Sequence, residues 1–385
     1  MKIAIPKEIL PGETRVAASP DSVKKFTSLG VEVLIEAGAG ESSSMLDDEL
    51  RVAGATIVAD AAAVYGEADM IIKVGAPYCS GEGQVDELAM IKPDAVLIGL
   101  LNPLFHKDKV EAYAKHGLTS FAMELIPRIS RAQSMDALSS QSNIAGYKAV
   151  IDAAGRFGRI LPMMMTAAGT IVPAKVVVLG AGVAGLQSIA TAHRLGAIVS
   201  AFDVRPAVKE QVESLGATFI EVEDTGSESA ETTGGYAREM GADYQKRQAQ
   251  LIHDTLVKQD ICISTAQIPG KKAPVLISEA MVKDMKAGSV IVDLATESGG
   301  NCELSERDKV VVKHGVTIIG HANYPARVPT DTSSLYARNL YNFVSPMIDG
   351  ETGNMKIDWE DEVIKGALLT RGGAVVNAAL IGEQT

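Results

Sequence analysis

Cysteine is scarce in this 385-residue sequence. The three cysteines, Cys79, Cys262 and Cys302, are far apart, form no CxxC pair and make no ligand-like cluster with the six histidines. This pattern argues against a disulfide framework and against a cysteine–histidine metal site. It is typical of reduced thiols in a cytosolic protein, and we expect no bound metal.

Positive charge is also in short supply. The chain has 36 Lys and Arg against 48 Asp and Glu, for a formal net charge of −12, and contains no basic run. Proteins that bind nucleic acid neutralise phosphates with clustered cations, so nucleic acid is excluded as the main partner.

Long apolar runs are missing as well. The most apolar region, 176–192, is interrupted by glycines and by Gln187, and falls short of the roughly 18 residues that cross a bilayer. The short apolar stretch 1–6 is soon followed by Glu8 and Glu13, which favours a strand over a signal peptide. We therefore expect a cytoplasmic chain without a membrane span of its own, which reaches any membrane through a partner.

Short apolar runs alternate with helical patterns from the first residue onwards. The predicted strands are 2–6, 31–36, 56–58, 70–74, 95–100 and 118–122. The predicted helices between them are 21–29, 47–53, 61–65, 83–90 and 110–116. Such a βαβ series indicates a parallel sheet with right-handed crossovers.

A second series starts near Val176. Its predicted strands are 176–179, 198–202, 218–220, 261–264, 290–294 and 317–319. The helical segments 134–159 and 333–343 are expected to connect the two series. We predict an α/β protein of two Rossmann-like, doubly wound parallel-sheet domains with a ligand-binding cleft between them. The first domain is discontinuous, residues 1–140 plus 330–385, and residues 141–329 form the second.

Two segments depart from this alternation. Pro162–Gly169 contains three consecutive methionines and is either packed in a core or an exposed hairpin that contacts a second subunit. Asp224–Gly241 is rich in Gly, Ser, Thr and Glu, which is typical of a long loop such as a lid.

A glycine motif follows the first strand of the second series. Gly180, Gly182 and Gly185 form GxGxxG after an apolar strand and before a helical run over 186–195. Gly180 permits the tight turn, Gly182 the approach of a pyrophosphate, and Gly185 close helix–strand packing. The helix N-terminus then offers N–H groups to the phosphates, so this context favours a dinucleotide site over a plain glycine turn.

Asp203 indicates which dinucleotide is preferred. It ends the next predicted strand, 18 residues after Gly185, near the spacing expected for a ribose contact. A carboxylate accepts hydrogen bonds from ribose hydroxyls and repels a 2′-phosphate, which favours NAD over NADP. Arg205 is a mild signal in the opposite direction, because an arginine nearby can hold that phosphate.

Two segments carry a resemblance to a known family. Ile5–Glu8 with Glu13–Pro20 resembles the N-terminal signature shared by alanine dehydrogenases and nicotinamide nucleotide transhydrogenases. Val177–Asp203 resembles the second signature of that family, and the resemblance extends over essentially the whole chain.

The alanine dehydrogenase branch fits poorly. Arg15 and Lys73 match two residues of its site, but Asn102 stands where the family has a histidine and Glu297 where it has an aspartate. Oxidation of an amino acid needs a general acid/base, and Asn102 cannot titrate.

The transhydrogenase branch fits well. Met123–Tyr147 and Thr232–Ala237 look like the NAD(H)-binding subunit of the Re/Si-specific, proton-translocating enzyme. This resemblance implies that four residues surround the nicotinamide and its ribose: Arg128, Gln133, Asp136 and Ser139. It also implies that Tyr236 lies on a mobile loop that closes over the nucleotide. Further contacts are implied for Ile129, Ser130, Ser134, Met135, Ala181, Gly182, Val183, Asp203, Val204, Arg205, Gly235, Gln248 and Gln267.

The residues alone leave alternatives to these roles. Arg128 can donate in a fork to a carboxamide or carboxylate, and Gln133 can bridge nicotinamide and ribose groups. The same polar segment also suits a helix N-terminus with Ser134 or Ser139 as its cap. Tyr236 equally suits a loop aromatic tucked against the body of the protein.

The resemblance implies direct hydride transfer between NAD(H) on this chain and NADP(H) on a partner. Such a reaction needs no general base, metal or covalent nucleophile, and the protein's contribution is positioning. Expected partners are an NADP(H)-binding subunit, a membrane-embedded proton-channel subunit and a second copy of the chain, peripheral to the inner membrane or on a matrix-equivalent side. The alternatives are an alanine dehydrogenase-like oxidoreductase and a non-catalytic NAD-binding module.

Overall fold

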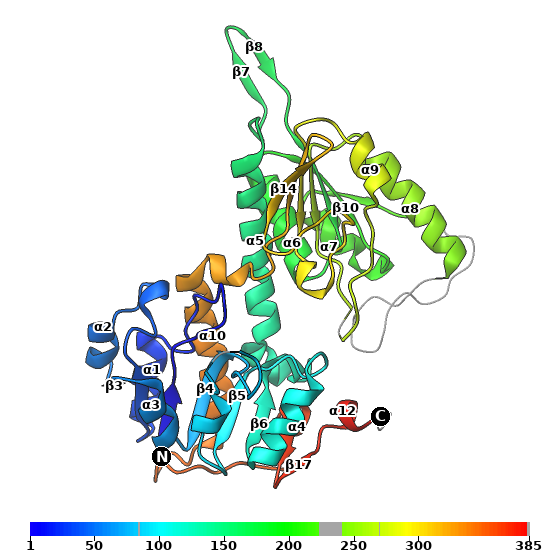
Figure 1. Cartoon of the computed structure of the whole chain (residues 1–385). Coiled ribbons are helices and arrows are strands. Elements are labelled where there is room, and N and C mark those ends of the chain that lie inside the picture. The colour runs from blue at the N-terminus through cyan, green and yellow to red at the C-terminus, as the bar shows by residue number, and fades with distance from the viewer. Residues whose placement is uncertain (84, 223–240, 269, 383–385) are drawn as a thin grey trace. The chain divides into compact units, whose positions relative to one another are not determined.

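The computed structural model describes residues 1–83, 85–222, 241–268 and 270–382 (Figure 1). The chain divides into two compact units, one of Met1–Gln141 with Ala326–Thr385 and one of Ser142–Pro325. The first unit is therefore discontinuous in sequence, and its two pieces share one sheet.

The first unit contains an eight-stranded sheet with the order β17-β16-β6-β5-β4-β1-β2-β3. Strands β1 to β6 are all parallel, and β16 and β17 add an antiparallel edge. The bounds are β1 Lys2–Ile5, β2 Glu32–Glu36, β3 Thr56–Val58, β4 Met70–Gly75, β5 Val96–Leu100, β6 Thr119–Ala122, β16 Leu368–Arg371 and β17 Ala374–Val375.

Helices cover both faces of this sheet. Alternate strand residues point to opposite faces, so Ile3 and Ile5 pack in one core and Ala4 in the other. Helices α1, α2, α10 and α11 contribute to the first core, and α3 and α4 to the second. The helices are α1 Pro20–Ser28, α2 Asp47–Val52, α3 Ala61–Glu67, α4 Lys107–His116, α10 Pro329–Val344, α11 Glu362–Ala367 and α12 Ala378–Ile381.

The second unit contains a seven-stranded sheet with the order β11-β10-β9-β12-β13-β15-β14. All its pairs are parallel except β14 with β15. Without β14, this is the 3-2-1-4-5-6 order of a dinucleotide-binding fold, and the order reverses between β9 and β12. The bounds are β9 Lys175–Leu179, β10 Ile198–Phe202, β11 Thr218–Ile220, β12 Ile261–Ser264, β13 Val290–Asp293, β14 Val310–Lys313 and β15 Val316–Ile319.

This second sheet is also doubly wound. Residues of α5, α6 and α7 pack on one face, and residues of α8 and α9 on the other. The helices are α5 Ala137–Arg156, α6 Val183–Arg194, α7 Lys209–Ser214, α8 Ala242–Leu256 and α9 Glu279–Asp284. The prediction of two Rossmann-like α/β domains is thus confirmed, with antiparallel strands at the sheet edges.

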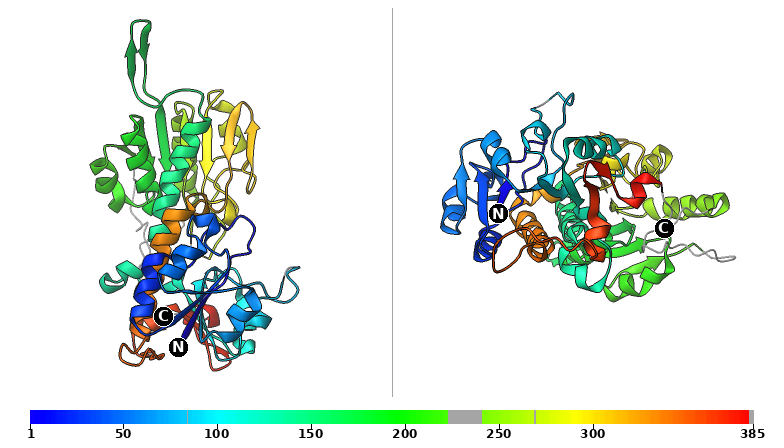
Figure 2. Two further views of the ribbon diagram at one scale, coloured as in Figure 1. Left: turned by 90° about the vertical axis from the view of Figure 1, so that its left-hand side faces the viewer. Right: turned by 90° about the horizontal axis from the view of Figure 1, so that it is seen from below.

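The methionine-rich segment forms an exposed hairpin, not a core element. Strands β7 (Met164–Thr166) and β8 (Gly169–Ile171) pair antiparallel, and all six of their residues are exposed. The hairpin extends away from the sheet of its own unit (Figures 1 and 2). Of the two interpretations, core packing is therefore wrong.

One predicted helix is absent. Of the predicted helix 83–90, the described residues contain only a 3₁₀ turn over Leu88–Met90. Gly81 and Gly83 have φ of 89° and 76°, which an α-helix does not tolerate, and Glu87 is buried against Lys73. Strands β14, β16 and β17 were not predicted.

Among the described residues, no helix has the length and apolar character needed to cross a membrane. Residues 223–240, which hold nearly all of the predicted long loop, lie outside the described portion of the chain.

Candidate dinucleotide-binding site

The glycine motif connects β9 to α6 in a tight turn. Gly180 has a φ of 98°, and its N–H donates to the carbonyl of Phe202 at 2.8 Å. A Cβ at this position would lie 2.7 Å from Thr265 Oγ1, and one on Gly185 would lie 1.8 Å from the carbonyl oxygen of Gly180. The fold itself therefore requires glycine at both positions.

Gly182 is different, because nothing in the described protein requires it to be glycine. Its φ is −77°, and a Cβ there would meet no atom within 4 Å. The space above this residue is open, as expected where a ligand approaches the backbone. Gly182 is also the N-cap residue of α6. Because no side chain accepts a hydrogen bond from the N–H groups of the first turn, these groups are available to an anion. This geometry fits a pyrophosphate.

Asp203 follows β10 and contacts the glycine turn directly. Its Oδ2 accepts the backbone N–H of Ala181 at 2.7 Å, and its Oδ1 accepts the backbone N–H of Arg205 at 2.9 Å. The Arg205 side chain donates to the same carboxylate, from Nε to Oδ1 at 3.0 Å and from Nη2 to Oδ2 at 2.9 Å. Three predicted site residues, Ala181, Asp203 and Arg205, are thus brought together, with Val204 between two of them.

Asn301 holds the segment that follows β12, and its role was not predicted from the sequence. Its Oδ1 accepts from Ser264 Oγ at 2.7 Å and from Ala266 N at 3.1 Å. Its Nδ2 donates to the carbonyls of Ala266 and Pro274, both at 2.8 Å. This segment carries Thr265, which packs on Gly180, and the exposed Gln267, whose amide donates to the Leu294 carbonyl at 3.2 Å.

A signal for this region was present in the sequence. Parallel strands end at the same edge of a sheet, and ligands bind where the strand order reverses. Gln267, shortly after β12, is accordingly a predicted site residue, although the contacts that Asn301 makes with this segment cannot be read from the sequence.

In the first unit, Asp136 caps helix α5. Its Oδ1 accepts the backbone N–H of Ser139 at 2.9 Å, and its Oδ2 accepts the Ser139 hydroxyl. The alternative interpretation as a helix N-terminus thus holds for this segment, but the capping residue is Asp136 instead of Ser134 or Ser139.

Helix α10 positions the polar residues that precede α5. The carbonyl of Ser134 accepts the side-chain amides of Asn339 at 2.9 Å and Asn342 at 3.0 Å. Ile129 and Met135 pack against the core of the unit. The remaining predicted residues of this segment, Arg128, Ser130, Gln133 and Ser134, are exposed. Apolar side chains therefore anchor the segment, and its polar side chains face outwards.

The other predicted residues are more scattered. Gln248 is half-buried in α8. Gly235 and Tyr236 lie outside the described residues. No group of three or more acidic, histidine or cysteine residues in the described chain is arranged to hold a metal ion.

Arg15 and Lys73, the two residues that match the alanine dehydrogenase site, form ion pairs with carboxylates of the same chain. Lys73 is buried, with Nζ 2.7 Å from Glu87 and 3.5 Å from Glu8. Arg15 is buried in an ion pair of 2.6 Å with Glu13. Burial raises the pKa of Glu8, which is consistent with an excess of acid in this cluster. Both cations are therefore paired with carboxylates of the same chain.

Comparisons with known proteins identify the family of the chain. Residues 4–145 match the family model "Alanine dehydrogenase/PNT, N-terminal domain", and residues 149–378 match the C-terminal domain model of the same name. The chain is 58% identical to the first part of NAD(P) transhydrogenase subunit alpha from Rhodospirillum rubrum, over all of both chains. It is 46% identical to the protein of the same name from Rickettsia prowazekii, covering 98% of this chain and 96% of the relative. A crystal structure of transhydrogenase from Sinorhizobium meliloti superimposes with a TM-score of 0.87 at 50% identity, covering 98% of this chain and 100% of that one.

Proposed function

Because the chain belongs to the alanine dehydrogenase/PNT family, we propose that it is the NAD(H)-binding component of a proton-translocating NAD(P) transhydrogenase. The observation that carries the proposal is the open space at Gly182, at the uncapped start of α6 and beside Asp203. In this arrangement the pyrophosphate lies on the turn, and Asp203 accepts the hydroxyls of the adenosine ribose.

For the first unit, we propose that Arg128, Gln133, Asp136 and Ser139 contact the nicotinamide and its ribose, and that Ile129, Ser130, Ser134 and Met135 flank them. The support is the exposure of Arg128 and Gln133 on a segment held by α10. Bound NAD(H) supplies the hydride chemistry, and the chain contributes orientation alone. A titrating base is not needed, which agrees with Asn102 at the family's histidine position.

The partners belong to the same proposal. The hydride acceptor is NADP(H) on a partner subunit, coupled to a membrane-embedded proton channel, and this chain is cytoplasmic and peripheral to the membrane.

The hairpin β7–β8 is the proposed contact with a second copy, since Met163, Met165 and Val172 expose 60%, 76% and 62% of their surface. A Met165→Asp variant is expected to lower the dimer fraction in analytical ultracentrifugation.

The proposal is tested in two steps. First, calorimetric titration with NADH is expected to show saturable binding that Asp203→Ala weakens. Second, a mixture of the chain, NADH, an NADP analogue and the partner subunits is expected to show hydride transfer. Absence of NADH binding contradicts the proposal, whereas binding without transfer favours a non-catalytic NAD-binding module.

An alanine dehydrogenase-like activity is tested separately. Pyruvate, ammonia and NADH are expected to give no oxidation of NADH, because this reaction needs a general acid/base and Asn102 cannot titrate. Turnover at a rate typical of dehydrogenases would support this second function instead.

A further inference from the structure

Every acceptor position on the Asp203 carboxylate is in use. A carboxylate offers about four lone-pair positions to hydrogen-bond donors. The backbone N–H groups of Ala181 and Arg205 take one position on each oxygen. The guanidinium of Arg205 takes the second position on each oxygen, at 3.0 and 2.9 Å. A ligand hydroxyl that donates to Asp203 must therefore displace one of these donors.

The two kinds of donor differ in how easily they leave. The backbone N–H of Ala181 belongs to the glycine turn, and that of Arg205 to the bend just after β10, so both are fixed by the fold. The Arg205 side chain is attached through rotatable bonds and is 14% exposed, whereas the Asp203 side chain is 5% exposed. The guanidinium is thus the donor that can leave the carboxylate.

We propose that Arg205 competes with the adenosine ribose for Asp203, and that Asp203 in turn keeps Arg205 from serving a 2′-phosphate. This inference rests on the proposed NAD(H) site and adds a second role to Asp203. The two hydroxyls of a ribose take the two acceptor positions that the guanidinium gives up. A 2′-phosphate removes one hydroxyl and brings two negative charges next to the buried carboxylate, so NADP(H) gains nothing from displacing Arg205.

The competition predicts opposite effects at the two positions. Arg205→Met removes the competitor and keeps an apolar stem, so NADH is expected to bind about three- to tenfold more tightly, which is the net contribution of about one ordinary hydrogen bond. Asp203→Asn removes the negative charge and releases Arg205, so NADH is expected to bind more weakly and NADPH at least about tenfold more tightly. The double variant is expected to lose the gain for NADPH, because the gain requires the guanidinium.

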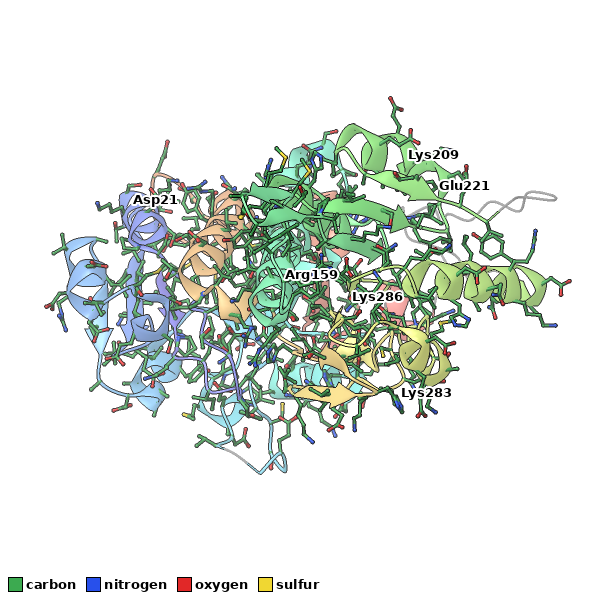
Figure 3. All side chains as sticks on the ribbon, turned by 90° about the horizontal axis from the view of Figure 1, so that it is seen from above. Asp21, Arg159, Lys209, Glu221, Lys283 and Lys286 are labelled. Atoms are coloured by element: carbon green, nitrogen blue, oxygen red, sulfur yellow. The ribbon has the colours of Figure 1, made fainter. Side chains whose placement is uncertain are left out.

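A matched control is available four residues away. Lys209 forms an exposed ion pair of 2.6 Å with Glu221, both labelled in Figure 3, and makes no contact with Asp203 in the described residues. Lys209→Met removes a positive charge from the same region, so it is expected to leave both affinities within about twofold of wild type.

The experiment is calorimetric titration of the full chain with NADH and with NADPH. The samples are wild type, Arg205→Met, Asp203→Asn, the double variant and Lys209→Met, each checked for folding by thermal unfolding. If Asp203→Asn does not fold, Asp203→Ser takes its place. NADH binding that is unchanged or weaker in Arg205→Met overturns the inference while leaving the NAD(H) site intact. No NADH binding by wild type contradicts the proposed function itself, so the two failures are distinguishable.

A direct reading comes from the Nε–Hε resonance of Arg205 in ¹⁵N NMR, assigned by its loss in Arg205→Lys. Saturating NADH is expected to move this signal away from its ligand-free position, because the ion pair with Asp203 is broken. A signal that stays at its ligand-free position shows that Arg205 remains on Asp203, which overturns the inference.

Discussion

In the first unit, the carboxylate of Glu124 accepts a hydrogen bond from the backbone N–H of Asn102. Asn102 has a φ of 50°, a left-handed conformation that asparagine tolerates better than most residues. The other oxygen of Glu124 is buried with no hydrogen-bond partner among the described residues. The position that the resemblance matches to a histidine of alanine dehydrogenases is therefore occupied by a neutral residue held by a buried acid.

Burial raises the pKa of Glu124 to about 7, which makes stability depend on pH. Between roughly pH 4.5 and 7 the native carboxyl keeps its proton while the unfolded one loses it, so the unfolded state binds fewer protons. Stability then falls as the pH rises through this window, by about 3 kcal/mol at most. Glu124→Gln is neutral at every pH and is expected to remove this fall.

The measurement is urea unfolding of wild type and Glu124→Gln at pH 5 and pH 8. The free-energy difference between the two proteins is expected to move in favour of the variant at pH 8. Glu297→Gln, at an exposed glutamate, serves as the control and is expected to show no such change. A constant difference between wild type and Glu124→Gln would mean that Glu124 titrates normally.

Alanine substitutions at Gly185 and Gly182 are expected to affect different properties, the first the stability of the fold and the second the binding of NADH. Gly185→Ala places a Cβ against the backbone of Gly180 and is expected to cost about 2 kcal/mol or more. Gly182→Ala has free space and an ordinary φ, so it is expected to change stability by less than about 0.5 kcal/mol but to weaken NADH binding severalfold. Thermal unfolding and NADH titration of both variants check this; Gly182→Ala with normal NADH affinity would remove that residue from the site.

The order of elements around this motif was predictable because local signals agree there. The apolar strand β9, the glycine spacing and the helical run of α6 all lie within 20 residues and need no distant contact. The predicted helix 83–90 was wrong for the opposite reason. Its helical pattern was overridden by glycines at positive φ and by the pairing of Glu87 with a lysine 14 residues away.

In the candidate site, too, features set by local sequence are predictable, whereas features set by contacts between distant residues are not. Asp203 was found from its spacing alone, but its contact with Arg205 depends on side-chain geometry. Asn301 and Thr265 were missed because they act through contacts with residues 35 and 85 positions away. The capping role of Asp136 was obscured by serines with similar preferences on either side of it. The residues proposed for the nicotinamide remain predictions.

Asn301 is expected to be important for both stability and binding. Its four side-chain hydrogen bonds are made to Ser264 at the end of β12, to Ala266 twice and to Pro274, and the residue is fully buried. Asn301→Ala leaves these partners without their bonds and is expected to cost about 2 to 4 kcal/mol. Asn301→Asp turns the two donors into a buried carboxylate oxygen that faces the carbonyls of Ala266 and Pro274, so a loss at least as large is expected in urea unfolding. Equal stability of Asn301→Ala and wild type would show that water replaces these bonds without cost.

Gln133 tests whether the exposed segment before α5 serves hydride transfer or nucleotide binding. Its side chain is exposed, so Gln133→Asn is expected to leave stability unchanged. If Gln133 contacts the nicotinamide as proposed, shortening the amide by one methylene withdraws it from the ring that it orients. The rate of hydride transfer is therefore expected to fall about tenfold or more while NADH affinity falls less than about threefold.

Arg131→Gln, which breaks an exposed ion pair with Asp361, is the control and is expected to change neither quantity. Stopped-flow transfer with the partner subunits and NADH titration give the two numbers. A loss of affinity with an unchanged transfer rate at saturating NADH would assign Gln133 to binding alone, because a group that stabilises ground state and transition state alike leaves the barrier between them unchanged.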